Sequence, residues 1–307
     1  MSPYRRFCLT SVGLVVAATI ASKCGGSSPS SPSPVPKVPD VGTGTAGPPA
    51  ILVGAGDIGQ CGSAAVAATA QLIDRVSGVV FTTGDNAYPN GSASNFRDCY
   101  EPHWGRHRER TRPTPGNHDY DSGGAAPYFS YFEGNAGPFG LGYYSYTAGA
   151  WRVIALNSEI PVGAGSAQLQ WLRSELGASR SACTLVYWHK PLFSSGPNGP
   201  NRDMREIWRV LYEFNADLIV NGHDHLYERF APQDPDGRLD SARGIRQITV
   251  GTGGGSLYTP VTSAANQEAI GIVHGVLRLT LNDTGYQWQF MPIPGASFGD
   301  AGVGQCH

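Results

Sequence analysis

The sequence predicts a layered α/β domain that begins near residue 50. Up to residue 225, short apolar runs alternate with segments of helical periodicity; beyond it, strand-like runs follow one another with no helix between them. The 307-residue chain is 40% hydrophobic and carries a formal net charge of −2, which suits a domain with a sizeable core. This charge balance argues against a nucleic-acid-binding protein, which would carry a strongly basic surface.

The predicted strands of the alternating part are apolar runs at 50–57, 78–85, 151–158, 183–189 and 216–225. The predicted helices carry apolar side chains at helical spacing and lie at 63–76, 166–176 and 202–215. The strand-like runs that follow lie at 244–255, 275–281 and 286–293. We expect these last runs to be neighbouring strands of a second sheet, because no helix separates them.

Residues 86–150 form a long region rich in Gly, Pro and aromatic residues. A loop-rich region of this length in a compact domain usually carries function. Its basic run, 106–112, also contains Glu109, and we interpret it as a solvated face or a helix end, with attraction of phosphate as the alternative. Side chains from 86–150 and 194–203 are expected to line a substrate pocket.

The N-terminal segment is predicted to lie outside the fold. Residues 1–24 place two arginines before a short apolar run, the outline of a secretory signal peptide. Cys24 follows the run where a lipidated cysteine would stand, so a lipid anchor is an alternative. Residues 25–49 are a Ser/Pro/Gly-rich linker that cannot bury a core. The folded domain is therefore expected at 50–307, in a protein exported to the periplasm, the cell surface or the medium.

The domain itself contains four cysteines, Cys61, Cys99, Cys183 and Cys306, and an exported protein can oxidise them. Four cysteines allow three sets of pairs, which sequence alone does not distinguish. We favour Cys61–Cys99, because both follow loops that are expected to converge.

Side chains that can bind a metal follow several of the predicted strands. They are Asp57, Asp85, His189, His223 and His225 after apolar strands, with Asn117 and His118 in a GNHD segment after a shorter one. The carboxyl ends of strands in an open α/β sheet face a common crevice, so these residues can converge. Oxygen and nitrogen donors without thiolates favour Fe, Mn or Zn. Each residue alone also fits a helix cap, a turn or a hydrogen-bonded histidine, but the ordered set makes that interpretation weaker.

The segments GD (56–57), GDNAY (84–88), GNHD (116–119), WH (188–189) and GHDH (222–225) resemble the five motif blocks of the calcineurin-like metallophosphoesterases. Most members carry a histidine where this chain has Gly59, and an aspartate where it has Tyr88. Both departures match the purple acid phosphatases, in which a tyrosinate replaces the missing ligand. The resemblance implies a four-layer αββα sandwich of two mixed sheets, in the small single-domain form, and makes 50–307 the catalytic domain.

Carried over to this chain, the resemblance implies a dinuclear metal centre. One site, holding Fe(III), would take Asp57, Tyr88, Asp85 and His225. The other, holding Fe(II), Zn(II) or Mn(II), would share Asp85 and add Asn117, His189 and His223. A phenol with an ordinary pKa near 10 needs a strong Lewis acid to ionise at neutral pH, which suits a trivalent ion.

The implied activity is hydrolysis of phosphomonoesters by direct attack of a metal-bound hydroxide. His118 is the candidate to protonate the leaving group or orient the substrate, with a structural role beside Asn117 or Asp119 as the alternative. Asn117 and Lys190 are further candidates for substrate contact, although Lys190 can equally point into solvent. The expected partner is a small phosphorylated substrate, with no nucleic acid and no membrane contact beyond the N-terminal anchor; the oligomeric state is not decided.

Other functions are open at this point. GAGDIG (54–59) matches the glycine pattern of a dinucleotide-binding fold, with Asp85 near the ribose position, but an NAD-dependent oxidoreductase leaves GNHD and GHDH unexplained. GTGGGS (251–256) lacks the Lys-Ser/Thr ending of a P-loop, and is interpreted as a loop lining the same crevice or as a plain turn. Closer alternatives keep the fold: a phosphodiesterase, nucleotidase or protein phosphatase with two divalent metals, or a surface-tethered binding protein with a degenerate site.

Overall fold

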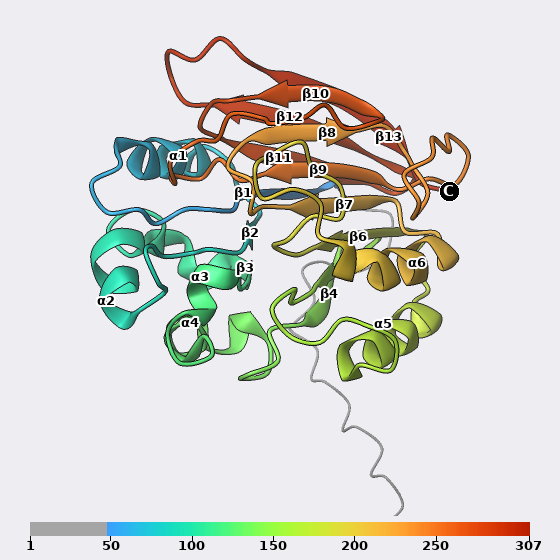
Figure 1. Ribbon diagram of the computed structural model, residues 1–307, viewed down its shortest axis with the longest axis horizontal. Coiled ribbons are helices and arrows are strands. Elements are labelled where there is room, and N and C mark those ends of the chain that lie inside the picture. The colour runs from blue at the N-terminus through green and yellow to red at the C-terminus, as the bar shows by residue number, and fades with distance from the viewer. Residues whose placement is uncertain (1–47) are drawn as a thin grey trace, which may run out of the picture. The chain divides into compact units, whose positions relative to one another are not determined.

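The computed structural model describes residues 48–307, which form two mixed β-sheets flanked by helices (Figure 1). The predicted signal peptide (1–24) and nearly all of the predicted linker (25–49) lie outside the described residues, so these assignments stay predictions. Within the described part, no helix is both long and apolar enough to cross a membrane.

In the six-stranded sheet, the first three strands of the chain pair in parallel. Strands from the end of the chain extend the sheet through antiparallel pairs. β1 pairs in parallel with β2, and β2 with β3. On its other side β1 pairs antiparallel with β11, Leu52 opposite Leu279. The order is β13 (Asp300–Gln305), β12 (Gly285–Pro292), β11 (Gly275–Asn282), β1 (Ala50–Ala55), β2 (Val79–Thr83) and β3 (Thr111–Thr114).

The seven-stranded sheet has a parallel centre and antiparallel edges. β5, β6, β7 and β9 run parallel to one another, and β4, β8 and β10 are antiparallel to their neighbours. The order is β10 (Gln267–Gly271), β8 (Tyr227–Phe230), β9 (Arg246–Val250), β7 (Leu218–Asn221), β6 (Cys183–Tyr187), β5 (Trp151–Ala155) and β4 (Tyr144–Ala148).

The central strands are apolar throughout because both of their faces are buried. In β5 and β6, Val153 and Leu185 belong to the apolar cluster shared with the six-stranded sheet. Their chain neighbours Ile154 and Val186 face the other way, into a second cluster with α5 and α6. Alternate residues of one strand thus pack on two layers, which explains a continuous rather than alternating hydrophobic run.

The helices occupy the outer layers and the long region between β2 and β4. Figure 1 shows α1 to α4 on the side of β1–β3, and α5 and α6 on the opposite side. The α-helices are α1 (Ala64–Asp74), α2 (Ala93–Asn95), α3 (Asn117–Tyr120), α4 (Ala126–Phe132), α5 (Ala167–Ala178) and α6 (Arg205–Glu213). Short 3₁₀ or π turns lie at Phe96–Tyr100, Gly105–Arg110, Glu133–Ala136 and Arg202–Met204.

The predicted sandwich of two mixed sheets is therefore confirmed, but one strand assignment is wrong. The run at 244–255 was expected beside the two later runs, yet β9 belongs to the seven-stranded sheet and pairs in parallel with β7. β8, which the sequence pattern did not separate from the preceding loop, returns the chain antiparallel to β9. Periodicity identifies a buried strand but not the sheet that receives it.

The basic run at 106–112 lies in a 3₁₀ turn and the start of β3, beside the end of α1. The Arg106 guanidinium binds Asp74 at 2.7 Å. The Arg110 guanidinium donates to the carbonyl oxygens of Ile73, Val76 and Gly78. A cation at the carboxyl end of a helix is stabilising, so both arginines serve the fold.

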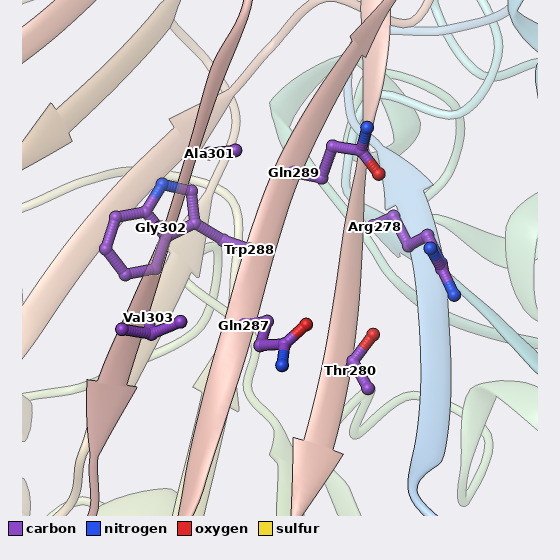
Figure 2. Close-up of a pocket in the computed structure, with 8 residues that line it drawn as sticks. All are labelled: Arg278, Thr280, Gln287, Trp288, Gln289, Ala301, Gly302 and Val303. Atoms are coloured by element: carbon purple, nitrogen blue, oxygen red, sulfur yellow. The ribbon is translucent and has the colours of Figure 1, made fainter.

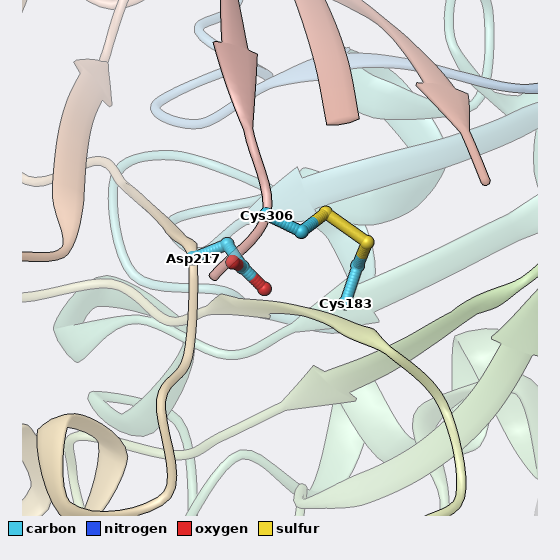
Figure 3. A group of neighbouring side chains, drawn as sticks. All are labelled: Cys183, Asp217 and Cys306. Carbon is cyan, nitrogen blue, oxygen red and sulfur yellow. A yellow bond between two sulfur atoms is a disulfide. The ribbon is translucent and has the colours of Figure 1, made fainter. Parts of the chain in front are cut away.

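Residues 48–307 contain two disulfide bonds, and one of them is the predicted Cys61–Cys99 pair. The other joins Cys183, at the first residue of β6, to Cys306, just after β13 (Figure 3). This bond connects the two sheets at the start of β6, opposite the end from which the following loop leaves. Asp217 lies beside it and accepts hydrogen bonds from the backbone N–H groups of Thr184 and His307.

Candidate metal centre

The predicted metal-binding side chains follow the carboxyl ends of strands from both sheets. Asp57 comes two residues after β1, Asp85 two residues after β2, and His189 two residues after β6. Asn117 follows β3 as the first residue of α3, and the GHDH segment with His223 and His225 follows β7. The two sheets therefore contribute to one site at a shared edge, as the strand-end argument predicts.

Three of these residues have an unusual backbone conformation. Asp57, Asp85 and His223 have φ values of 60°, 50° and 73°, in a region that residues other than glycine rarely adopt. Such conformations are costly and persist at sites where the surrounding structure imposes them. Here each one turns a polar side chain from the end of its strand toward the same centre.

Four donor atoms surround one point of the site. The Tyr88 phenol oxygen lies 3.0 Å from Asp57 Oδ1, 3.1 Å from Asp85 Oδ2 and 3.0 Å from His225 Nε2. His225 Nε2 is also 3.2 Å from Asp57 Oδ1. Two carboxylates and an imidazole thus surround the phenol oxygen within a buried space.

A second group of donors surrounds the His189 imidazole. Its Nε2 atom lies 3.1 Å from Asn117 Oδ1, 3.1 Å from His223 Nδ1 and 3.3 Å from Asp85 Oδ2. Asp85 therefore belongs to both groups. One residue that touches both clusters is the arrangement expected of a bridging carboxylate.

Hydrogen bonds on the far side of two rings orient them toward the centre. His189 Nδ1 donates to the carbonyl oxygen of Thr83 at 2.8 Å, and His225 Nδ1 donates to that of Ser256 at 2.7 Å. A carbonyl only accepts, so in the neutral ring Nε2 carries a lone pair directed at the neighbouring oxygen atoms. Acceptors that face acceptors need a proton or a metal ion between them. Without a metal, burial opposes protonation of His189, but the Asp85 carboxylate outweighs burial and raises the pKa of His189 to about 10, so this ring holds a proton there; the donor chemistry fits hard or borderline metal ions that would replace it.

The electrostatics of the cluster agree with this need for a cation. Burial raises the pKa of the Tyr88 phenol well above its usual value, and the Asp57 and Asp85 carboxylates raise it further. Burial opposes ionisation of Asp85, but the His189 imidazole outweighs it and holds the Asp85 pKa below its usual range. Burial, reinforced by His189, lowers the pKa of His223 to about 3. Among the protein groups alone, the phenol stays protonated.

Glycines allow the carboxylates to sit against the backbone. A Cβ atom on Gly116 would lie 2.2 Å from Asp85 Oδ1, and one on Gly222 would lie 2.7 Å from Asp57 Oδ2. The freed space brings backbone donors close: the His118 N–H binds Asp85 Oδ1 at 2.8 Å, and the His223 N–H binds Asp57 Oδ2 at 2.9 Å. These bonds fix the other oxygen of each carboxylate toward the donor cluster.

His118 lies at the rim of the cluster. Its ring packs on Tyr88 with centroids 4.6 Å apart, and its Nδ1 donates to the Pro89 carbonyl at 2.6 Å. Nε2 lies 3.9 Å from Asp85 Oδ2, and the side chain is 35% exposed. The free nitrogen is therefore beside the donor cluster and open to solvent.

Lys190 is the predicted site residue that the structure does not bring to the donors. Its ammonium group binds Glu159 at 2.5 Å, and Ser158 donates to the other oxygen of the same carboxylate. It lines a hollow of ≈ 550 Å³ together with residues of 158–163 and 202–206. A phosphate contact by Lys190 stays a prediction.

Three supporting residues were not predicted to be part of the site. Asp119 accepts from the backbone N–H of Gly116 and from Asn86, so it ties the GNHD loop to the GDNAY loop. Asp224, between the two site histidines, accepts from the Asn198 N–H and anchors the 194–203 region. Tyr258 stacks on His225, with centroids 4.1 Å apart and planes 6° apart. Only GNHD and GHDH could have pointed to Asp119 and Asp224; nothing marked Tyr258.

The glycine-rich loop at 251–256 packs against the first strand of the site. Gly253 N–H donates to the Gly56 carbonyl, and Gly255 N–H to that of Asp57. In GAGDIG, therefore, Asp57 faces the donor cluster, and α1 begins only at Ala64. This arrangement does not fit a dinucleotide-binding turn that opens a helix directly.

The fold and this site define a metallophosphoesterase. Residues 52–227 match the family model of the calcineurin-like phosphoesterases, more than half of the chain and every residue of the donor cluster. The chain belongs to this family, which sets aside the dinucleotide-binding hypothesis.

Within the family, the chain is similar to purple acid phosphatases. It is 29% identical over 229 residues to purple acid phosphatase 21 of Arabidopsis thaliana, covering 65% of this chain and 49% of the relative. It is 27% identical over 195 residues to purple acid phosphatase 15 of the same plant, covering 52% and 37%. The chain thus spans less than half the length of these relatives. The fold of a purple acid phosphatase from yellow lupin (Lupinus luteus) matches with a TM-score of 0.71 at 19% identity, covering 85% of this chain and 54% of the other.

Proposed function

We propose that this domain hydrolyses phosphomonoesters with a dinuclear metal centre of the purple-acid-phosphatase type. Asp57, Tyr88 and His225 would hold Fe(III), and Asp85, which touches both donor groups, would be shared with the second site. Asn117, His189 and His223 complete the second site, which holds Fe(II), Zn(II) or Mn(II). This division follows the donor chemistry, because Asp57 and the Tyr88 oxygen lie with one imidazole on one side of Asp85, and the other side has only the amide and two imidazoles.

The observation that carries the proposal is the contact of the Tyr88 phenol with both carboxylates and with His225. The protein alone keeps this phenol protonated. A strongly charged cation among these donors would reverse that preference, since a coordinating ion stabilises the phenolate. Without a bound cation, burial of the phenol beside two carboxylates would cost folding free energy with no gain in function.

The bound ions would supply a nucleophile from water and neutralise charge on the phosphoryl group. The chain's own residues hold and orient the reactants. Thr83 and Ser256 fix the ring orientation of His189 and His225 through their carbonyl groups. Because the Nδ1–H of His118 is bound to the Pro89 carbonyl, only the doubly protonated ring can give a proton from Nε2 to the leaving alkoxide. The neutral ring can instead position the substrate by accepting a hydrogen bond at Nε2.

The proposal is tested by hydrolysis of p-nitrophenyl phosphate by the full chain. Asp85→Asn keeps the shape of the side chain but removes the bridging charge, and it should lower kcat by at least about a hundredfold. Asp283→Asn makes the same charge change at an exposed position and should retain wild-type turnover. Unchanged turnover in Asp85→Asn would contradict the dinuclear assignment.

Turnover of bis(p-nitrophenyl) phosphate separates the monoesterase from a phosphodiesterase of the same fold. We expect the monoester to have the higher kcat/KM. A preference for the diester, in a colourless protein with two divalent ions, would refute the iron-dependent monoesterase but not the family assignment.

We further propose that the protein works outside the cytoplasm, on a small phosphorylated substrate. The two disulfide bonds support this, because such bonds persist in oxidising compartments. Cell fractionation with an intact N-terminal segment tests the export, and mass spectrometry at Cys24 tests lipidation. Protein found only in the cytoplasm would contradict export.

A further inference from the structure

The outer face of the β11–β12–β13 sheet is polar and open to solvent. Tyr286, Trp288 and Phe290 of β12 are buried in the core, whereas Gln287 and Gln289, between them, are exposed. Figure 2 shows the register of this face: Gln289 lies beside Arg278, and Gln287 beside Thr280. Polar side chains of neighbouring strands thus form rows across the face.

Two adjacent hollows form one groove on this face. The first, of ≈ 330 Å³, lies over β11 to β13, and the second, of ≈ 280 Å³, lies between β11, β12 and the end of α1. They share Arg278 and Gln289. The groove therefore runs from Val303 on the edge strand β13 to Arg75 and Ser77 beyond α1.

The charge of the groove has one sign. Among the residues that the structure describes, Arg75 and Arg278 are the only charged ones that line the groove, and no acidic residue lines either hollow. Within residues 48–307, neither guanidinium has a hydrogen bond or an ion-pair partner. This is notable in a chain whose formal net charge is −2.

Nearby acids do not neutralise the groove, because they are bound elsewhere. Asp74, next to Arg75 in the chain, accepts from Arg106 at 2.7 Å and lies 3.0 Å from His107. Asp300, at the start of β13, binds Arg229 and accepts from Trp288. The guanidinium groups of Arg75 and Arg278 are thus available to bind an anion from solution.

We propose that this groove binds an acidic polysaccharide. A guanidinium group binds a carboxylate through two parallel hydrogen bonds, and two such groups in one groove suit a chain with repeated carboxylates. Gln287, Gln289 and Thr280 each donate and accept, as contact with sugar hydroxyl groups requires. Val303 is 68% exposed at the end of the groove and offers an apolar contact to a ring face.

The shape of the groove agrees with an extended ligand. It crosses the strands from β13 to β1, three inter-strand spacings, or about 14 Å. Arg75 and Arg278 line the second hollow together, and a polymer that runs from there across the strands also meets Gln287 and Val303 in the first hollow, which a single small anion cannot do. The metal centre lies beyond the strand ends, so occupation of this groove should not change turnover of a small phosphoester.

The test is the affinity of the full chain for immobilised polygalacturonate, with neutral dextran as a second probe. Arg75→Gln and Arg278→Gln should each weaken binding about tenfold, and the double variant should reach the level of dextran. Binding of the wild type should weaken with added salt. Hydrolysis of p-nitrophenyl phosphate and the melting temperature should stay unchanged in all three variants.

A matched control carries the same charge change elsewhere. Arg180 and Arg202 are exposed, and Arg180→Gln/Arg202→Gln should bind polygalacturonate like the wild type. An equal loss in this control, or wild-type affinity in Arg75→Gln/Arg278→Gln, would overturn the proposal. So would tighter, arginine-dependent binding to phosphatidylglycerol vesicles, or a dimer in sedimentation that buries this face.

Discussion

At the scale of single residues, the site depends on side chains that the backbone forces into contact. Asp57, Asp85 and His223 adopt positive φ values, and each follows a glycine. Tyr88 reaches the same point from a turn three residues beyond Asp85. The sequence predicted Asp57, Asp85 and His223 because each follows a recognisable strand, whereas the role of Tyr88 was implied only by the family resemblance. The sequence did not predict Tyr258, because its contact with His225 exists only in three dimensions.

The first prediction concerns Tyr88. Tyr88→Phe removes the oxygen that touches Asp57, Asp85 and His225 but keeps the ring that packs on His118. In iron-loaded protein we expect the visible phenolate-to-iron absorption band to disappear and kcat to fall at least about tenfold. Tyr258→Phe keeps its stack on His225 and should retain the band. A band that survives in Tyr88→Phe would remove Tyr88 from the metal centre.

The second prediction concerns Gly116. Gly116→Ala places a methyl group 2.2 Å from Asp85 Oδ1, so the carboxylate must move. Gly116 has a φ of −122°, and the effect therefore comes from contact and not from backbone strain. Metal affinity, measured by competition with a chelator, should fall about tenfold or more. Gly134→Ala, where no atom lies within 4 Å, should keep wild-type affinity; equal effects in both variants would contradict the role of close packing.

At the scale of elements, strands and helices in the alternating part followed their sequence patterns, but the assignment of strands to sheets did not. β9 has the composition of any buried strand, and only its pairing with β7 places it in the seven-stranded sheet. β3 and β13 carry Pro or Gly and have little hydrophobic pattern. Their pairing with β2 and β12 is a tertiary effect that local propensity does not contain.

The third prediction compares the two disulfide bonds. They link residues 38 and 123 positions apart. In the loop-entropy model, the longer loop gives the Cys183–Cys306 bond about 1 kcal/mol more stabilisation than Cys61–Cys99. Urea unfolding of the paired serine variants measures both losses, expected in the range of about 2–5 kcal/mol. A larger loss from Cys61→Ser/Cys99→Ser would show that local packing outweighs chain entropy.

The fourth prediction concerns Asp217, beside the second disulfide. Burial raises the pKa of this carboxyl to about 6, although the Thr184 and His307 N–H groups oppose the shift. The folded state then holds a proton that the unfolded chain, with a pKa near 3.9, releases earlier. The Asp217 contribution to stability should therefore fall as pH rises from about 4 to 6, by about 2–3 kcal/mol, and then level off.

Asp217→Asn isolates this effect, because asparagine does not titrate. The difference in unfolding free energy between wild type and variant, measured by urea at several pH values, should shrink across this window as the wild type loses stability. A difference independent of pH between 4 and 7 would show that the carboxyl pKa is not raised.

At the scale of the whole molecule, the centre joins the two sheets. Asp57 follows the six-stranded sheet and His223 the seven-stranded sheet, and the two are 166 residues apart in the chain. A metal ion held by both loops binds the folded state and not the unfolded chain, so it must stabilise the domain.

The fifth prediction follows from this linkage. At a free metal concentration 100 times Kd, the gain is about 2.7 kcal/mol, or roughly 5–10 °C in Tm for a domain of this size. Differential scanning calorimetry of chelator-treated and metal-loaded protein measures it. Asp85→Asn should lose most of the gain, while Asp283→Asn should keep it. An equal Tm with and without metal would contradict binding by residues of both sheets.

The donor residues of the centre are spread over the chain from Asp57 to His225, and neither sheet alone presents a full set. The metal centre can therefore form only after the two sheets have packed together. A chain that ends before the GHDH segment lacks His223 and His225, so we expect it to complete neither metal site and to show none of the proposed phosphatase turnover.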